Sequence, residues 1–329
     1  MNYKDIADLS KDIFYSGHRF PDNMDLIVGV PRSGMLAASI VATHRNLPLI
    51  DIAGFLAGTP PWFGDTKALK PSLRFQSSWE ARAPLVIDDS ILTGASMKKV
   101  GKQLEYAGLR DRSNIGAVYY EPDSEYDIDF ALAPVRYPRI FEWNLMHKSI
   151  LNHSCVDIDG VLCRDPTPEE NDDGPRYRAF LEQVPALQTP SQTIGYLVTS
   201  RLERYREETE QWLRANGIRF HHLYMMNLGS AAERRRLGGH GFFKGNIYKK
   251  VDASLFIESA HQQAMEIAQI SGKSVLSFEN GELVQPGGIR GALSRGRMEI
   301  QKGSWKRHIP EPIKVLYRKY LLSGGLVKN

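Results

Sequence analysis

The sequence is poor in cysteine and has no long apolar run. Only two of its 329 residues are Cys, at positions 155 and 163, which excludes a scaffold held by several disulfides and favours a reducing compartment. No apolar stretch reaches 18 residues, so no membrane-spanning segment is expected. No early apolar run precedes a small-residue cleavage site either. These absences predict a cytoplasmic protein.

Basic residues are slightly fewer than acidic ones except at the carboxyl end. The chain carries a net charge of +4. Residues 286–329 hold ten Lys or Arg and two Glu, a net charge of +8, so the first 285 residues are acidic on balance, at −4. Within this tail, residues 311–322 place apolar side chains at helical spacing with bases off that stripe. Such a helix can lie on an anionic membrane surface or dock on its own protein.

What is present is the composition of ordinary globular protein, with 42% hydrophobic and 24% charged residues. The length exceeds one typical domain, so two domains are expected. Short apolar runs alternate with segments of helical periodicity along most of the chain. This alternation is typical of α/β domains with parallel sheets.

The most informative stretch is PLVIDDSILTGASM, residues 84–97. A short apolar strand ends in Asp88 and Asp89, and a helix begins after four small residues. Free backbone N–H groups at a helix start suit a phosphate, and paired carboxylates suit ribose hydroxyls or hydrated Mg²⁺. The pattern therefore indicates a sugar phosphate site. Its helix-start residues are Thr93, Gly94, Ala95 and Ser96.

This segment resembles the phosphoribosyl pyrophosphate (PRPP) motif of the type I phosphoribosyltransferases. The resemblance implies that the two aspartates hold the ribose hydroxyls and that residues 93–96 surround the 5-phosphate. The earlier loop VPRSG follows a predicted strand at residues 25–30 and resembles the pyrophosphate loop of the same family. Its Ser-Gly turn and one guanidinium offer the donors that a diphosphate needs; these residues are Arg32, Ser33 and Gly34.

Two further segments of the first half fit this family in part. Residues 54–82 show no periodicity, and a long loop of this kind is often a functional lid. Its candidates to reach the pyrophosphate are Lys67, Lys70 and Arg74, although each also suits a solvated basic loop. Residues 136–144, RYPRIFEWN, resemble the hood of the 6-oxopurine enzymes. The order Phe141-Glu142-Trp143 departs from the usual one, so either a purine acceptor or simple edge-strand packing fits it.

A second set of motifs begins near residue 153. A strand candidate ends in DIDGVL, with Asp157 and Asp159 two residues apart. Residues 195–198 form an apolar run that leads into Thr199. Lys244 lies in the segment FFKGNIYKK, and residues 253–257 lead into Glu258.

These four parts resemble, in the same order, the motifs of the haloacid dehalogenase (HAD) phosphohydrolases. The resemblance implies that Asp157 attacks phosphorus and that Asp159 protonates the leaving oxygen and then activates water. Thr199 would bind the phosphoryl group and Lys244 would neutralise it. Mg²⁺ would be held by Asp157, Asp159 through its carbonyl, and Glu258, which stands where the family usually has two acids.

Residues 163–192 would form a small cap inserted after the first HAD motif. Four side chains there are available to read a substrate, although each also suits a solvated surface: Arg164, Arg176, Tyr177 and Arg178.

The sequence thus predicts an α/β protein with two Rossmann-like parallel-sheet domains and a basic tail. The boundaries are 1–148 for a phosphoribosyltransferase domain, 149–285 for a HAD-like phosphatase domain with a small cap, and 286–329 for the tail with its amphipathic helix. The predicted activity is transfer of 5-phosphoribose from PRPP to an acceptor, followed by hydrolysis of the 5-phosphate, with Mg²⁺ at both sites.

The favoured acceptor is a sugar hydroxyl of a glycan or lipid-linked glycan, because the fusion resembles the bacterial pair that supplies ribofuranose to surface polysaccharides. One alternative is a nucleobase acceptor with a nucleotidase domain, and another is a PRPP-sensing regulator. The predicted location is cytoplasmic, with peripheral membrane contact through the tail. No nucleic-acid partner is predicted, and a homodimer is left open.

Overall fold

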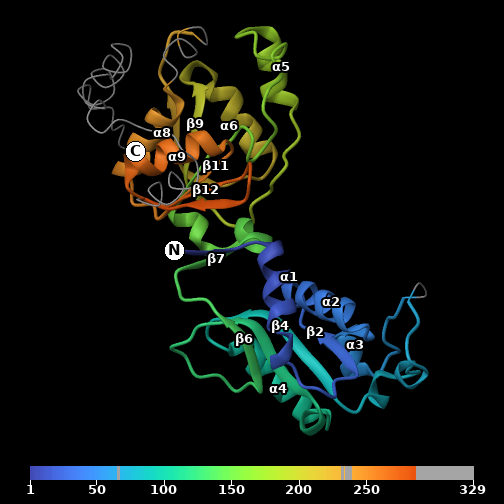
Figure 1. The fold of residues 1–329 in the computed structure, drawn as a ribbon. Helices are drawn as coiled ribbons and strands as arrows, with labels where there is room; N and C mark the ends of the chain where they lie inside the picture. Colours follow the sequence, from blue (N-terminus) through green and yellow to red (C-terminus); the bar gives the residue numbers. More distant parts are fainter. Residues whose placement is uncertain (65–66, 231–232, 234–238, 287–329) are drawn as a thin grey trace. The chain divides into compact units, whose positions relative to one another are not determined.

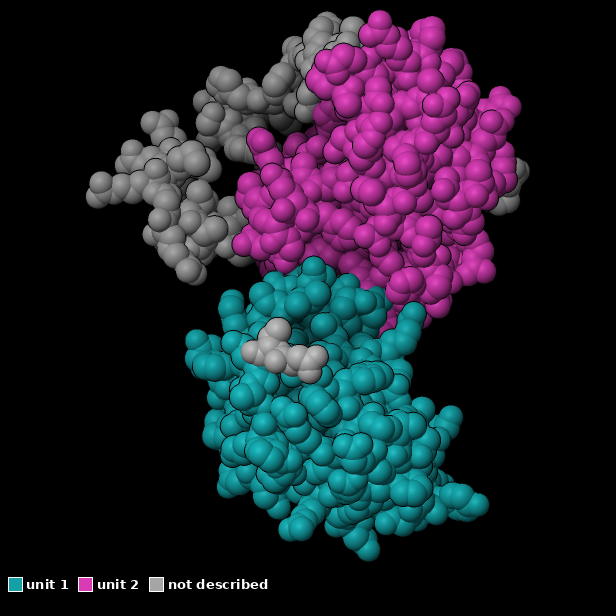
Figure 2. Space-filling view, turned by 90° about the vertical axis from the view of Figure 1, so that its right-hand side faces the viewer, with its two compact units in different colours: residues 1–144 teal, residues 145–329 magenta. Residues whose placement is uncertain are grey.

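A computed structural model describes residues 1–64, 67–230, 233 and 239–286 of the chain. The chain divides into two compact units, residues 1–144 and 145–329, which are coloured separately in Figure 2. Each unit is described by itself. The first boundary predicted from the sequence, at residue 148, lies four residues beyond this division.

The first unit is built on a five-stranded parallel sheet with strand order β3-β2-β4-β5-β6 (Figure 1). Helices lie in the crossovers from β2 to β3, β3 to β4 and β4 to β5, whereas residues 121–129 between β5 and β6 form turns and loop. The strands are β2 (Leu26–Gly29), β3 (Leu49–Asp51), β4 (Pro84–Ile91), β5 (Asn114–Tyr120) and β6 (Phe130–Pro134), and the helices are α1 (Ile6–Tyr15), α2 (Ser33–Arg45), α3 (Ile52–Ala57) and α4 (Ala95–Tyr106).

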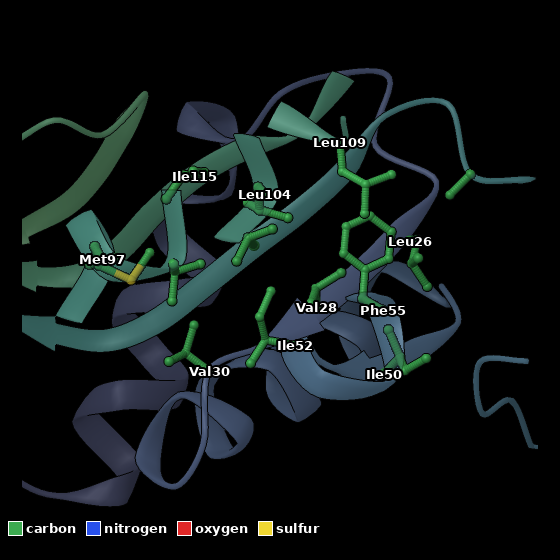
Figure 3. Packing of buried hydrophobic residues seen from close by; sticks show 14 of the residues in the cluster. Leu26, Val28, Val30, Ile50, Ile52, Phe55, Met97, Leu104, Leu109 and Ile115 are labelled. Atoms are coloured by element: carbon green, nitrogen blue, oxygen red, sulfur yellow. The ribbon is translucent and has the colours of Figure 1, made fainter. Parts of the chain in front are cut away.

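Both faces of this sheet are buried, which explains why its strands are apolar at successive positions. On one face, Leu26 and Val28 of β2 pack with Phe55 of α3 and Leu104 of α4, as Figure 3 shows. On the other face, the alternate residues of the same strands pack with α1 and α2. Helices on both faces leave the strand ends as the open edge of the layer, where ligands bind in such sheets.

A separate pair of strands joins the two ends of the first unit. Strand β1 (Asn2–Lys4) pairs in parallel with β7 (Arg139–Phe141), outside the main sheet. Beyond β7, the Glu142 carboxylate accepts a hydrogen bond from the Ile6 backbone N–H at 2.9 Å. The amino-terminal segment therefore fixes the path of the residues that follow β7.

The second unit holds a six-stranded sheet with order β10-β9-β8-β11-β12-β13. All neighbouring pairs are parallel except β12 with β13. The strands are β8 (Ser154–Val156), β9 (Ile194–Leu202), β10 (Phe220–Met226), β11 (Leu255–Glu258), β12 (Val275–Ser277) and β13 (Glu282–Val284), and the helices are α5 (Pro175–Gln183), α6 (Arg206–Ala215), α8 (His240–Lys250) and α9 (His261–Ser271).

The predicted class, α/β with two Rossmann-like parallel sheets, is confirmed. One local prediction was wrong: residues 54–82 were predicted to form a long loop, but the first four of them belong to a helix. Helix α3 begins at Ile52, and its start is capped by Asp51, whose carboxylate accepts the Gly54 N–H at 2.7 Å. Two short 3₁₀ turns follow, at Pro71–Leu73 and Ser78–Glu80.

The basic helix predicted for the tail lies outside the described residues. Among the residues that the structure describes, no helix has the length and apolar character needed to cross a bilayer.

Candidate active sites

The acidic pair of the first unit lies inside strand β4 rather than in a turn after it. The strand runs on to Ile91, and Asp88 is in register with Ala117 of β5. Both carboxylates are buried, because Asp88 is only 8% exposed and Asp89 only 3%. Burying two adjacent carboxylates is costly unless donors or cations surround them. The pair is therefore a place where a ligand with hydroxyls or a bound cation would be stabilised.

Helix α2 begins directly against this pair. A Cβ added to Gly34 would lie 2.8 Å from Asp88 Oδ1 and 3.0 Å from the carbonyl oxygen of Ile87. Only glycine permits so close an approach. The contact brings the first-loop residues predicted to hold pyrophosphate beside the aspartates predicted to hold ribose, although they are 54 residues apart in sequence. Arg32 at the helix N-cap is exposed and Ser33 is half-buried.

The predicted phosphate loop forms the start of helix α4. Gly94 is the N-cap residue and has a φ of +72°, a value that favours glycine. Thr93 Oγ1 accepts the Ala95 N–H at 3.4 Å. The loop is held from outside by Tyr126, whose hydroxyl donates to the Leu92 carbonyl oxygen at 3.0 Å. Thr93, Ala95 and Ser96 are exposed, so a phosphate can reach the first turn of the helix.

The structure adds one residue to this site whose role the sequence did not reveal. Trp143 Nε1 donates a hydrogen bond to Asp89 Oδ2 at 2.8 Å. The sequence placed Trp143 in a possible hood or an edge strand, and only the fold brings it to the acidic pair. Glu142, its neighbour, is engaged with the backbone of α1 instead. The candidate lid residues Lys67, Lys70 and Arg74 are exposed.

In the second unit, three predicted residues form one buried cluster. Lys244 of α8 donates to Asp157 Oδ2 at 2.6 Å and to Glu258 Oε2 at 2.8 Å, and Gln263 Oε1 lies 3.2 Å from the same ammonium. Asp157 and Glu258 follow or end neighbouring strands β8 and β11. The parallel sheet thus brings together side chains that are up to 101 residues apart in sequence.

The electrostatics of this cluster follow from its burial. Burial raises the pKa of Asp157 well above its ordinary value, and Glu258 adds to the rise while Lys244 opposes it. Burial alone would lower the pKa of Lys244, but Asp157 and Glu258 raise it instead. One ammonium therefore faces two carboxylates. The excess of negative charge in a buried space is the condition under which a further cation is stabilised.

Asp159 is bound by a different cation, Arg201. The guanidinium is fully buried, and its Nε and Nη2 donate to the Asp159 carboxylate at distances from 2.6 to 3.2 Å. The ring of Trp212 lies on the guanidinium, 5.7 Å from its carbon. Burial alone would lower the pKa of Arg201, and the Asp159 carboxylate raises it. The sequence analysis assigned no role to Arg201, because no local pattern indicates a partner 42 residues away.

Thr199 lies within β9, not after it, and the strand is irregular there. From Val198 to Leu202 the strand advances four residues while its partner advances two, from Tyr224 to Met226. A bulge of this kind redirects side chains and is common at functional sites. Thr199 is buried, and its Oγ1 accepts the Arg201 N–H at 3.2 Å. The bulge thus orients both Thr199 and Arg201.

The Mg²⁺ site predicted for the second unit consists of two carboxylates and one backbone carbonyl. Within the part of the chain that the structure describes, no three His, Cys, Asp or Glu side chains are grouped as a metal site. Two carboxylates, of Asp157 and Glu258, lie together, and the third predicted ligand is the backbone carbonyl of Asp159. Oxygen donors of net negative charge fit Mg²⁺, which completes its shell with water and phosphate. A cation there would favour the charged form of Asp157.

The residues predicted to read a substrate from the cap are mostly engaged in holding it. Tyr177 is buried and its ring meets that of Tyr205 at 4.9 Å. Arg178 forms an ion pair with Glu208 of α6. Arg164 pairs with Glu170 at 2.6 Å. Three of the four candidates therefore have partners within the unit, while Arg176 is exposed.

Comparisons with known proteins give distant likenesses only. A xanthine-guanine-hypoxanthine phosphoribosyltransferase from Helicobacter pylori is 16% identical with a TM-score of 0.32, and the match covers 43% of this chain and 92% of that one. A purine phosphoribosyltransferase from Pyrococcus horikoshii Ot3 is 18% identical with a TM-score of 0.30 and the same coverage. UMP synthase from Leishmania donovani is 14% identical with a TM-score of 0.26, over 40% of this chain and 27% of that one.

No protein-family model matches the chain, and no curated protein matches it. At TM-scores below 0.5, these likenesses carry no conclusion about the fold or the substrate of this chain.

Proposed function

We propose that the first unit transfers 5-phosphoribose from PRPP to an acceptor and that the second unit removes the 5-phosphate from the product. The transferase activity is supported above all by the close approach of Gly34 to Asp88. This approach brings the candidate diphosphate loop next to the candidate ribose-binding aspartates. The exposed start of α4 supplies the third element, a phosphate cradle. All three groups of a phosphorylated ribose diphosphate thus find suitable partners at one sheet edge.

The second half is supported by the Asp157, Lys244 and Glu258 cluster. Asp157 is the candidate nucleophile, since it is held by hydrogen bonds at the end of β8. Lys244 would stabilise the charge of an incoming phosphate, and Thr199 would bind one of its oxygens. Mg²⁺ bound by Asp157, Glu258 and the Asp159 carbonyl would neutralise the phosphoryl oxygens.

The orientation of Asp159 is set by Arg201, whose Nη2 donates to Asp159 Oδ1 at 2.6 Å. The guanidinium thus holds the candidate acid–base carboxylate in one position. In the proposed hydrolysis, Asp159 would give a proton to the leaving oxygen and then take one from the attacking water.

The favoured acceptor is a hydroxyl of a glycan or lipid-linked glycan, since transfer followed by dephosphorylation leaves a plain pentose on the acceptor. The half-buried indole of Trp143 beside Asp89 favours a second candidate, a planar nucleobase, which stacks on aromatic rings. The regulator hypothesis needs PRPP binding without transfer. Peripheral membrane contact through the tail, residues 286–329, stays a prediction, since the structure describes none of the residues from 287 on.

One experiment separates these possibilities. The protein is incubated with PRPP, Mg²⁺ and panels of nucleobases and glycans, and released pyrophosphate is measured. Release with a glycan supports the proposal, and release only with a base supports the second candidate. If PRPP binds but no pyrophosphate is released in either panel, the result supports the PRPP-sensing regulator. If PRPP does not bind, all three hypotheses are contradicted.

The coupling of the two units is tested with Asp157→Asn. This change removes the charged nucleophile, so no aspartyl-phosphate can form. We expect the variant to accumulate an acceptor that carries one pentose and one phosphate by mass spectrometry, where the unchanged protein gives pentose alone. Dephosphorylated product at the normal rate would show that the second unit acts on another substrate. Lys250→Met, an exposed change on α8, is the control.

A further inference from the structure

Trp143 is one of three mutually stacked aromatic rings in the first unit. The centroids are 5.3 Å apart for Tyr119 and Phe141, 5.0 Å for Phe141 and Trp143, and 6.3 Å for Tyr119 and Trp143, and the planes of each pair are within 22° of parallel. The Tyr119 hydroxyl donates to Asp12 of α1 at 2.8 Å. The stack is thus anchored to a helix that packs on the main sheet.

The backbone on either side of the stack is also fixed. Phe141 is the last residue of β7, where it is in register with Lys4 of β1. Glu142 is tied to the start of α1 through the Ile6 N–H. The indole of Trp143 therefore has little freedom to rotate, because both its ring partners and its own main chain are held.

The rigid indole presents its only polar atom to Asp89. Trp143 Nε1 and Ser90 Oγ lie 2.8 and 3.3 Å from the same oxygen, Asp89 Oδ2. A carboxylate has about four acceptor positions, so these two donors fix the carboxylate plane while positions remain for a ligand. Trp143 and Asp89 are 54 residues apart, and the bond is formed only in the folded unit.

We propose that Trp143 is a positioning residue for PRPP, acting through Asp89. The inference rests on the proposed use of PRPP by the first unit. By fixing the carboxylate plane before the sugar arrives, the indole removes the cost of ordering Asp89 on binding. The ribose hydroxyls are held in the ground state and in the transition state alike, so the gain is in PRPP affinity rather than in turnover.

The test compares two changes that each remove one hydrogen bond from the same stack. Trp143→Phe keeps an aromatic ring next to Phe141 and loses the N–H bonded to Asp89. Tyr119→Phe keeps its ring and loses the O–H bonded to Asp12, which does not touch the acidic pair. PRPP binding is measured by calorimetry with Mg²⁺, and unfolding is followed in urea for all three proteins.

We expect Trp143→Phe to weaken PRPP binding about tenfold, or about 1.4 kcal/mol, and Tyr119→Phe to leave the affinity within twofold. Where an acceptor supports transfer, KM for PRPP should rise about tenfold with kcat within twofold. Equal affinities for the unchanged protein and Trp143→Phe, or equal losses in the two variants, would overturn the positioning role alone. An unchanged protein that binds no PRPP would overturn the proposed function, and the inference with it.

Discussion

In the first unit, the hydrogen bonds described for Asp89 come from an indole and a hydroxyl; in the second, Asp157 and Glu258 share a buried ammonium and Asp159 is bound by a buried guanidinium. Neutral donors orient a carboxylate without cancelling its charge, whereas buried cations cancel most of it. The first site is thus suited to a ligand that arrives with its own cation, as PRPP does with Mg²⁺. In the second, Lys244 is one cation against the two carboxylates of Asp157 and Glu258, so part of the negative charge there is balanced before any ligand binds and part is left for a further cation.

The largest effect is expected from removing the acidic pair of the first unit. Asp88→Asn with Asp89→Asn should abolish transfer, because neither amide can provide the charged acceptors that ribose hydroxyls and Mg²⁺ need. Phosphate release from a supplied phosphoribosylated acceptor should be unchanged, because the two candidate sites are built on separate sheets and share no residue. Pyrophosphate and phosphate release are measured side by side. Loss of both activities in a folded variant would contradict the two-site assignment.

Removing the shared cation of the second unit should affect stability more than any surface change. Lys244→Met leaves two buried carboxylates facing each other, and breaking a buried ion pair in this way costs about 3–5 kcal/mol. Denaturant unfolding of the second unit measures this loss. Lys250→Met on the exposed side of the same helix should change stability by less than about 0.5 kcal/mol. Similar losses of unfolding free energy in the two variants would mean that Lys244 does not stabilise the buried carboxylates.

A smaller effect is expected where the first loop meets the acidic pair. Gly34→Ala places a Cβ 2.8 Å from Asp88 Oδ1, so helix α2 must shift, at a cost of about 1–3 kcal/mol and with weaker PRPP binding.

The matched control is Gly101→Ala in the middle of α4. Its new Cβ would meet only Ile115 Cδ1, at 3.9 Å. This change should stabilise the unit by about 0.5–1 kcal/mol. If thermal unfolding and PRPP binding respond equally to both substitutions, the close approach of Gly34 to Asp88 is not what holds the site together.

The smallest effect concerns a surface pair of the cap. Hydrogen bonds from Arg164 lower the pKa of Glu170 to about 2. Because the pKa is lowered in the folded state, the contribution to stability is present above the ordinary carboxyl pKa and is lost as the pH falls toward about 2. In Arg164→Ala, NMR titration should show this pKa returning toward its ordinary value. A value still near 2 would assign the shift to the Thr167 contacts instead.

Much of the fold could be predicted because its signals are local. The apolar run at residues 84–87 marked β4, and residues 114–120 were placed correctly as a strand. The predicted strand at residues 25–30 was confirmed as Leu26–Gly29. The start of α3 was missed, since its six residues are too few to show periodicity and only the Asp51 cap marks it.

The candidate sites were predictable only in their motif residues. Asp157, Lys244 and Glu258 were grouped from sequence and do lie together, while their roles stay predictions. Arg201 and Trp143 could not be assigned, because their partners Asp159 and Asp89 lie 42 and 54 residues away and no local pattern encodes such a pair.

The pairing of β1 with β7 has a consequence for how the chain acquires this site during synthesis. Residues 2–4 leave the ribosome before their partners at residues 139–141, which follow on the order of ten seconds later at ordinary elongation rates. Until then the amino-terminal strand has no partner, and Trp143, which emerges just after β7, cannot reach Asp89. Strands β3, β2 and β4 of the nascent first unit can pair early, yet its acidic pair is oriented only when nearly the whole unit has been made.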